Sequence, residues 1–178
     1  MKPYVDICIK KGTDLDRQYL VDRVRDPKLG TNSNVVYIYA LADGEVNYPN
    51  KPGHVIYIGE AGRPTEPTGK RFGQHISTGE NIGGDSGAIY ALSRYYWLGR
   101  CIRLQIFLMD GQQKRKELER SLLNAHVKEY GALPICQGTT GDNYKTTVLS
   151  ALTIPPDQLA LFVPASKDSL RPTPCPRG

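Results

Sequence analysis

Two short runs decide the fold of this chain: Val35-Val36-Tyr37-Ile38-Tyr39 and Val55-Ile56-Tyr57-Ile58-Gly59. Both are rich in β-branched and aromatic residues, which are typical of strands. The connection between them, residues 42–53, is rich in Gly, Pro and Asn, which favour turns. The sequence therefore predicts an antiparallel hairpin with a long loop, its strands over residues 35–41 and 54–59.

Hydrophobic periodicity extends the hairpin into a small domain. Alternation predicts a third strand over residues 102–108 and a short strand over residues 5–9. Helical spacing predicts helices over residues 16–24, 70–76, 88–98 and 112–130. Asp110 with Gln113 resembles an N-terminal cap for the last helix, and Gly131 predicts its end.

These elements predict one α/β (α+β) domain, with a mixed or antiparallel three-stranded sheet flanked by helices. A chain of 178 residues is long enough for one such core. We expect the domain to span residues 1–170, with its core at about 35–137. Residues 171–178 contain three prolines, and we expect them to form a disordered tail.

The composition narrows the functional classes only slightly. A net charge of +5 and a pI near 9.0 are compatible with a polyanionic partner, although many basic proteins never touch nucleic acid. The apolar stretches are too short to span a bilayer and the N-terminus lacks a secretory pattern, so we expect a soluble cytoplasmic protein without a membrane partner. The four cysteines form no CxxC pair, which argues against a zinc site and a disulfide scaffold.

Four side chains around the hairpin could act on a phosphate diester: Tyr37, Tyr57, Arg71 and His75. Arg71 and His75 lie one helical turn apart, so both can face one site. An arginine can bind a phosphate with two hydrogen bonds, and a tyrosine can accept a proton where a nearby cation lowers its pKa. The alternative interpretation is structural: the two tyrosines would be ordinary aromatic residues of a strand, and Arg71 with His75 would form a solvated basic turn. Tyr37 and Tyr39 point the same way, so the pattern alone does not say which faces a site.

Hydrolysis also calls for a carboxylate that can hold a divalent cation. The helix predicted over residues 112–130 offers Glu117, Glu119 and Glu129. Glu119 precedes Leu122 and Leu123 by three and four residues and therefore flanks the apolar face, whereas Glu117 leans toward solvent. Most helix glutamates only form exposed ion pairs.

In this arrangement the chain resembles the GIY-YIG nuclease superfamily. Val35-Val36-Tyr37 and Tyr57-Ile58-Gly59 stand for the two triplets, and Leu118-Glu119-Arg120-Ser121-Leu122-Leu123 resembles the segment of the metal-binding glutamate. Pro134 follows, as in the family. Val35 stands where the family has glycine, and either Gln137 or Asn143 could replace the family's asparagine.

The resemblance implies a standalone, restriction-endonuclease-like enzyme that hydrolyses DNA with Mg2+ or Mn2+ on Glu119. It further implies Tyr37 as the base, Tyr57 as a group that orients water or phosphate, and Arg71 as the group that stabilises charge. His75 would assist proton transfer or polarise Tyr37. Double-stranded DNA is the expected partner, a homodimer is possible, and type II restriction or phage defence is the favoured cellular role.

Basic residues near this set could contact nucleic acid, and we expect Lys70, Arg94 and Arg100 to do so. The segment from Ser77 to Arg100 mixes arginines with aromatics, but its Tyr-Tyr-Trp run is as compatible with a core helix. Three other functions stay open. They are a nucleic-acid-binding module without catalysis, a structure-selective repair or mobile-element nuclease, and a protein-interaction domain.

Overall fold

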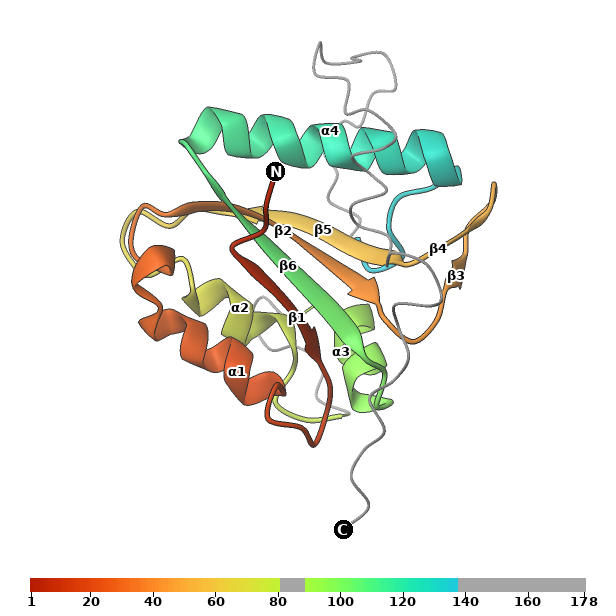
Figure 1. Ribbon diagram of the computed structural model, residues 1–178, viewed down its shortest axis with the longest axis horizontal. Helices are drawn as coiled ribbons and strands as arrows, with labels where there is room; N and C mark the ends of the chain where they lie inside the picture. Colours follow the sequence, from red (N-terminus) through yellow and green to blue (C-terminus); the bar gives the residue numbers. More distant parts are fainter. Residues whose placement is uncertain (81–88, 138–178) are drawn as a thin grey trace.

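A four-stranded antiparallel sheet forms the centre of the molecule (Figure 1). The computed structural model describes residues 1–80 and 89–137. The strand order is β1-β6-β2-β5, where β1 is Val5–Ile9, β6 is Ile102–Met109, β2 is Asn34–Leu41 and β5 is Val55–Ala61. The expected hairpin is confirmed, because β2 and β5 pair antiparallel.

The expectation of three strands is wrong, because β1 joins the sheet as a fourth. It pairs with β6 along its whole length, from Val5 opposite Ile106 to Ile9 opposite Ile102. The alternation that predicts the strand also buries Val5 and Ile9 in the core. Its partner lies almost a hundred residues away, and alternation within a strand does not specify a distant partner.

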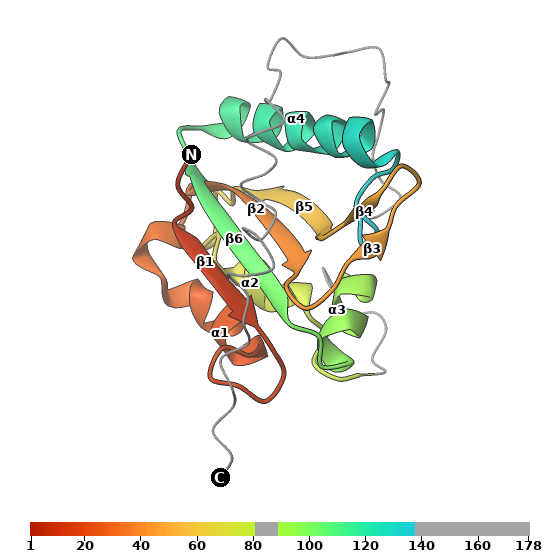
Figure 2. The same ribbon diagram turned by 45° about the vertical axis from the view of Figure 1, so that its right-hand side comes forward.

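Helices cover both faces of the sheet (Figures 1 and 2). On one face lie α1 (Arg17–Asp22), α2 (Lys70–His75) and α3 (Tyr90–Trp97), and on the other lies α4 (Gln112–Tyr130). Alternate residues of β2 therefore enter two different cores: Tyr37 and Tyr39 face α2, while Val36 and Ile38 pack with Leu122 and Leu123 of α4.

The last helix has the predicted bounds but not the predicted cap. Gly131 has φ 79° and ends α4, as expected, by donating its N–H to the Val127 carbonyl. Gly111, with φ 97°, occupies the N-cap position without a side-chain hydrogen bond. The Gln113 side chain instead donates to Glu117 within the helix, so the Asp110 cap is wrong.

The remaining short elements fill the connections. The long loop of the hairpin carries a small ribbon of β3 (Val46–Asn47) and β4 (Pro52–Gly53). After α1 come two 3-10 turns, η1 (Arg23–Arg25) and η2 (Pro27–Leu29). No helix in the part of the chain that the structure describes is long and apolar enough to cross a membrane. The expected tail at 171–178 lies outside the described residues.

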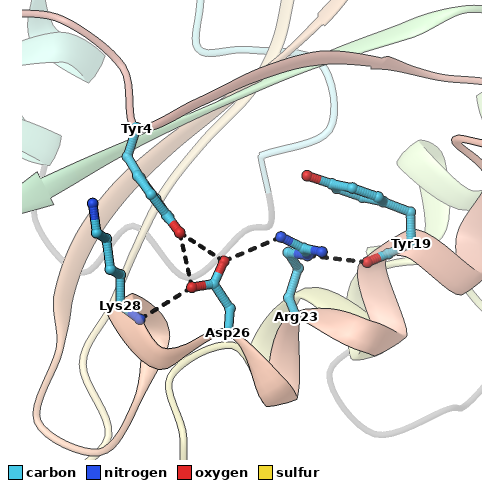
Figure 3. Close-up of polar contacts among 5 residues, drawn as sticks. All are labelled: Tyr4, Tyr19, Arg23, Asp26 and Lys28. Atoms are coloured by element: carbon cyan, nitrogen blue, oxygen red, sulfur yellow. Dashed lines mark hydrogen bonds and ion pairs between the residues drawn. The ribbon is translucent and has the colours of Figure 1, made fainter.

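Asp26 ties the N-terminal segment to the helical layer (Figure 3). Its carboxylate accepts hydrogen bonds from the Tyr4 hydroxyl at 2.8 Å and the Lys28 backbone N–H at 3.0 Å, and pairs with Arg23 at 3.1 Å. The carbonyl of Arg23 in turn lies against Gly69, where an added Cβ would come within 1.9 Å of its oxygen. This contact with η1 fixes the start of α2, the helix that carries Arg71 and His75.

Candidate active site

Three tyrosines and one histidine form an aromatic cluster between the sheet and α2, in which hydrogen bonds join two of the tyrosines to the histidine. The Tyr37 hydroxyl lies 3.2 Å from His75 Nε2, and the Tyr39 hydroxyl lies 2.8 Å from His75 Nδ1. The Tyr57 ring stacks on the Tyr37 ring, with centroids 6.1 Å apart and planes 21° apart. The structure therefore brings together three of the expected residues, Tyr37, Tyr57 and His75, and adds Tyr39.

The glycine of the second triplet has a steric role in this cluster. Gly59 lies directly opposite Tyr37 in the β2–β5 ladder. A Cβ at Gly59 would lie 2.7 Å from the Tyr37 hydroxyl oxygen and 2.7 Å from the Tyr57 ring. The absence of a side chain at Gly59 therefore lets the two phenols approach each other across the hairpin.

Arg71, the fourth expected residue, acts electrostatically on the whole cluster. It is partly buried on α2, one turn before His75. Burial raises the pKa of Tyr37 well above its usual value and raises that of Tyr57, while the charge and hydrogen bonds of Arg71 lower both. A guanidinium in this position favours the phenolate form of both tyrosines, and it also offers hydrogen bonds of the kind a phosphate accepts.

His75 is fully buried and carries no charge at neutral pH. Burial lowers its pKa well below the usual value of 6.5, and the charges of Arg71 and Arg63 lower it further. A neutral imidazole has one nitrogen that donates and one that accepts. His75 can therefore accept a hydrogen bond from one of the two tyrosines and donate one to the other.

The three phenols differ in their access to solvent. Tyr37 and Tyr39 are fully buried, whereas Tyr57 is only half-buried on the edge strand β5. Tyr57 is therefore closer to solvent at the edge of the sheet than Tyr37, the tyrosine that the resemblance implies as the base.

Glu119, the expected metal ligand, reaches the same edge strand from the opposite face of the sheet. It lies on α4, and its negative charge raises the pKa of Tyr57 further. Partial burial, together with the nearby carboxylate of Glu60, raises the pKa of Glu119 itself to about 7, although Arg115 and Arg120 oppose the shift. The expected catalytic set thus straddles β5, with the aromatic cluster on one face and the carboxylate on the other.

An arginine that the sequence analysis did not select supports this carboxylate. Arg115 is buried on α4 one turn before Glu119, forms an ion pair with Glu60, and donates from Nη1 to Asn34 Oδ1 at 2.8 Å. A Cβ at Gly62 would overlap the Arg115 guanidinium, so this close packing needs a glycine there. In the sequence, Glu60 directly follows the second triplet. This position is the one signal that could have indicated Glu60 as part of the site.

The carboxyl groups at this edge fit a divalent cation that is held in part by its substrate. No group of three or more His, Cys, Asp or Glu side chains suited to a metal ion occurs among residues 1–80 and 89–137. Mg2+ commonly takes only one or two protein carboxylates and completes its shell with water and phosphate oxygens. Glu119, whose pKa is raised by burial and by the neighbouring carboxylate of Glu60, suits that role, and Glu60 is already paired with Arg115.

Gln137, one of the two candidate amides that follow Pro134, is bonded to the edge strand. Its Oε1 accepts a hydrogen bond from the Ile58 backbone N–H at 3.3 Å, and the neighbouring Cys136 N–H donates to the Ile56 carbonyl at 2.8 Å. These bonds hold the exposed edge of β5 on either side of Tyr57. The alternative amide, Asn143, lies outside the described residues.

The three expected nucleic-acid contacts all form ion pairs within the protein. Lys70 Nζ lies 2.6 Å from Glu66, Arg94 Nη1 lies 3.7 Å from Glu80, and Arg100 Nε lies 3.0 Å from Asp43. Lys70 and Arg94 are held by one carboxylate oxygen each. Asp43 also accepts a hydrogen bond from the Cys101 backbone N–H at 2.9 Å. The ion pair between Arg100 and Asp43 therefore helps to hold the loop after β2 against the start of β6.

The aromatic run in the same segment is largely structural. Tyr96 is buried, and its hydroxyl accepts the backbone N–H of Arg17 at 3.0 Å. Trp97 is partly buried and donates to the Ser77 hydroxyl at 3.3 Å. Residues 81–88, the glycine-rich part of this segment, lie outside the described residues.

The chain matches no protein-family model, and comparison with curated proteins and with solved structures returned no match.

Proposed function

We propose that this protein is a metal-dependent endonuclease that hydrolyses DNA phosphodiester bonds at the edge of β5. The observation that carries the proposal is the arrangement of Tyr37, Tyr57, Arg71 and His75 in one cluster, with Glu119 acting on Tyr57 from the other face. Phenols, a guanidinium and a partly buried carboxylate at one strand are the groups that phosphoryl chemistry uses.

Each group has a task that its surroundings support. Glu119 would hold Mg2+ or Mn2+, which would supply charge neutralisation at the phosphate and a more acidic water. Arg71 would bind a non-bridging phosphate oxygen and stabilise the charge that develops on it. Tyr57, the accessible phenol, would contact the attacking water, and Tyr37 and His75 would orient Tyr57 from behind.

The basic character of the chain supports a polyanionic substrate. The net charge of the chain is +5. The side chains of Lys70 on α2 and Arg94 on α3 are both accessible to solvent. Contacts between such side chains and phosphates would orient DNA without reading its sequence. A restriction or phage-defence role and action as a homodimer are part of this proposal.

The experiment that tests the function is incubation of the purified protein with supercoiled plasmid, with Mg2+, Mn2+ or EDTA. We expect nicked or linear DNA only with a metal, and sequencing of the ends would show whether cuts fall at one duplex sequence. Cuts confined to flaps or junctions would instead indicate a repair or mobile-element nuclease.

A module that binds nucleic acid without cutting it is the alternative with a specific observation in its favour. Tyr37 is fully buried and its pKa is raised well above the usual value, which makes it a poor base at neutral pH. Salt-dependent DNA binding without cleavage in either metal would support this alternative. DNA binding that is weak and insensitive to salt would favour a protein-interaction domain.

A further inference from the structure

Tyr39 is the member of the aromatic cluster that the proposed reaction leaves without a role. Its ring is completely buried, and its hydroxyl lies 2.8 Å from His75 Nδ1. It lies deeper than Tyr57, which is its direct partner in the β2–β5 ladder, and the centroids of the two rings are 6.3 Å apart. Within the described residues the hydrogen bond of the Tyr39 hydroxyl is to His75, so its polar contribution passes through that ring.

The two hydrogen bonds of His75 differ in length in a way that indicates their direction. A neutral ring donates from one nitrogen and accepts at the other. Hydroxyl donors form shorter hydrogen bonds than N–H donors do. The 2.8 Å contact fits Tyr39 donating its O–H to Nδ1, and the 3.2 Å contact fits Nε2–H donating to the Tyr37 oxygen.

The surroundings of Tyr39 favour the same direction. For the Tyr39 hydroxyl, the hydrogen bond found within the described residues is the one to His75. If Nδ1 donated to Tyr39, the Tyr39 proton would need a second acceptor in the core, and an unpaired buried donor costs about 1 to 3 kcal/mol.

We propose that Tyr39 is a positioning residue that holds neutral His75 in its Nε2–H form, so that His75 donates to the oxygen of Tyr37. The series of hydrogen bonds runs from Tyr39 to His75 and from His75 to Tyr37. The Tyr37 ring in turn stacks on the ring of Tyr57, which belongs to the edge strand β5. The significance for catalysis rests on the proposed function, whereas the tautomer does not.

The direct test is a two-bond proton–nitrogen NMR spectrum of the full chain labelled with 15N-histidine, recorded without DNA. The chain has three histidines, so His75 can be assigned by elimination with His54→Asn and His126→Asn. We expect wild-type His75 to be neutral, with a proton on Nε2 and none on Nδ1. A proton on Nδ1 in the wild type would overturn the proposal.

Tyr39→Phe tests the role of the residue itself. In the folded variant we expect a mixture of both neutral tautomers and a single-turnover cleavage rate about tenfold below wild type. The matched control is Tyr96→Phe, which also removes a buried phenol hydroxyl and should leave both the His75 spectrum and the rate unchanged. A folded Tyr39→Phe that keeps only the Nε2–H form would overturn the role of Tyr39. A wild-type protein that has the expected tautomer but cuts no DNA would instead refute the proposed nuclease function.

Discussion

Glu119 and Tyr57 lie on opposite faces of the edge strand β5, to which Tyr57 belongs, and the charge of the carboxylate raises the pKa of the phenol. Tyr57 belongs to the core beneath α2 and α3, while Glu119 lies on α4, which covers the other face. A substrate that reaches both groups must therefore lie along the edge of β5. A phosphate there would lie between a guanidinium on one side and a carboxylate-bound cation on the other.

Removing the Glu119 charge should stabilise the protein at alkaline pH. Its pKa of about 7 exceeds the usual 4.5, so the folded protein holds this proton more tightly than the unfolded chain does. The free energy of unfolding therefore falls as pH rises from 4.5 to 7 and stays lower above 7. We expect Glu119→Gln to gain about 1 to 2 kcal/mol at pH 8, because solvent screening of a partly exposed carboxyl reduces the upper limit of roughly 3 kcal/mol.

Urea denaturation in EDTA at pH 4 and pH 8 would measure this gain. The two proteins should be nearly equal at pH 4 and differ at pH 8. Glu117→Gln, two residues earlier on α4, where the carboxylate accepts a hydrogen bond from Gln113, is the control and should show no gain at either pH. A gain of equal size at both pH values would contradict the account of Glu119.

The aromatic cluster and Arg71 should be required for cleavage. We expect Tyr37→Phe and Arg71→Ala each to lower the single-turnover rate by at least about a hundredfold, because Tyr37 orients the phenol that contacts the attacking water and Arg71 stabilises charge on the phosphate. Circular dichroism would confirm that both variants fold. A near-normal rate for Tyr37→Phe would show that Tyr57 or a metal-bound water acts without Tyr37.

Gly59 should tolerate no side chain. A Cβ there would lie 2.7 Å from the rigid rings of Tyr37 and Tyr57, so the rings would have to move apart. We expect Gly59→Ala to lower the free energy of unfolding by about 1 to 3 kcal/mol, as is usual for overpacking. Gly30→Ala, whose Cβ would meet its nearest neighbour at an ordinary 3.5 Å, is the control. Equal stability of the two variants, measured by urea denaturation, would show that the rings do not need this glycine.

The two arginines expected to contact DNA should behave differently. Arg94 forms one long ion pair at 3.7 Å, whereas Arg100 is bound to Asp43 and helps to hold the loop after β2. We expect Arg94→Ala to weaken DNA binding and to reduce the slope of log affinity against log salt by about one. Fluorescence anisotropy at several salt concentrations would measure this slope. An unaltered slope for Arg94→Ala, with a reduced one for Arg100→Ala, would reverse the assignment.

Much of the local structure was predictable because the deciding signals are local. The β2–β5 hairpin follows from two β-branched runs separated by turn residues, and α4 follows from its apolar stripe and from Gly131. The pairing of β1 with β6 was not predictable, because alternation identifies a strand without naming its partner. The Asp110 cap failed because Gly111 adopts the left-handed region, where the helix begins without a side-chain cap.

The candidate site was predictable only in part. Spacing brought Arg71 and His75 to one face of a helix, and the hairpin brought Tyr37 beside Tyr57. Strand alternation left Tyr37 and Tyr39 equivalent, and in the structure both contact His75, through different nitrogens. The roles of Glu60 and Arg115 depend on how α4 packs on the edge of β5, which no local pattern specifies.

The most direct test of the nuclease proposal is plasmid cleavage by wild type, Glu119→Gln and Glu117→Gln in Mg2+, with DNA binding measured for all three. We expect the wild type and Glu117→Gln to cut, and Glu119→Gln to bind DNA with similar affinity while cutting at least a thousandfold more slowly, because a neutral amide holds the cation poorly. Cleavage by Glu119→Gln at the wild-type rate, or loss of cleavage in Glu117→Gln alone, would contradict the account.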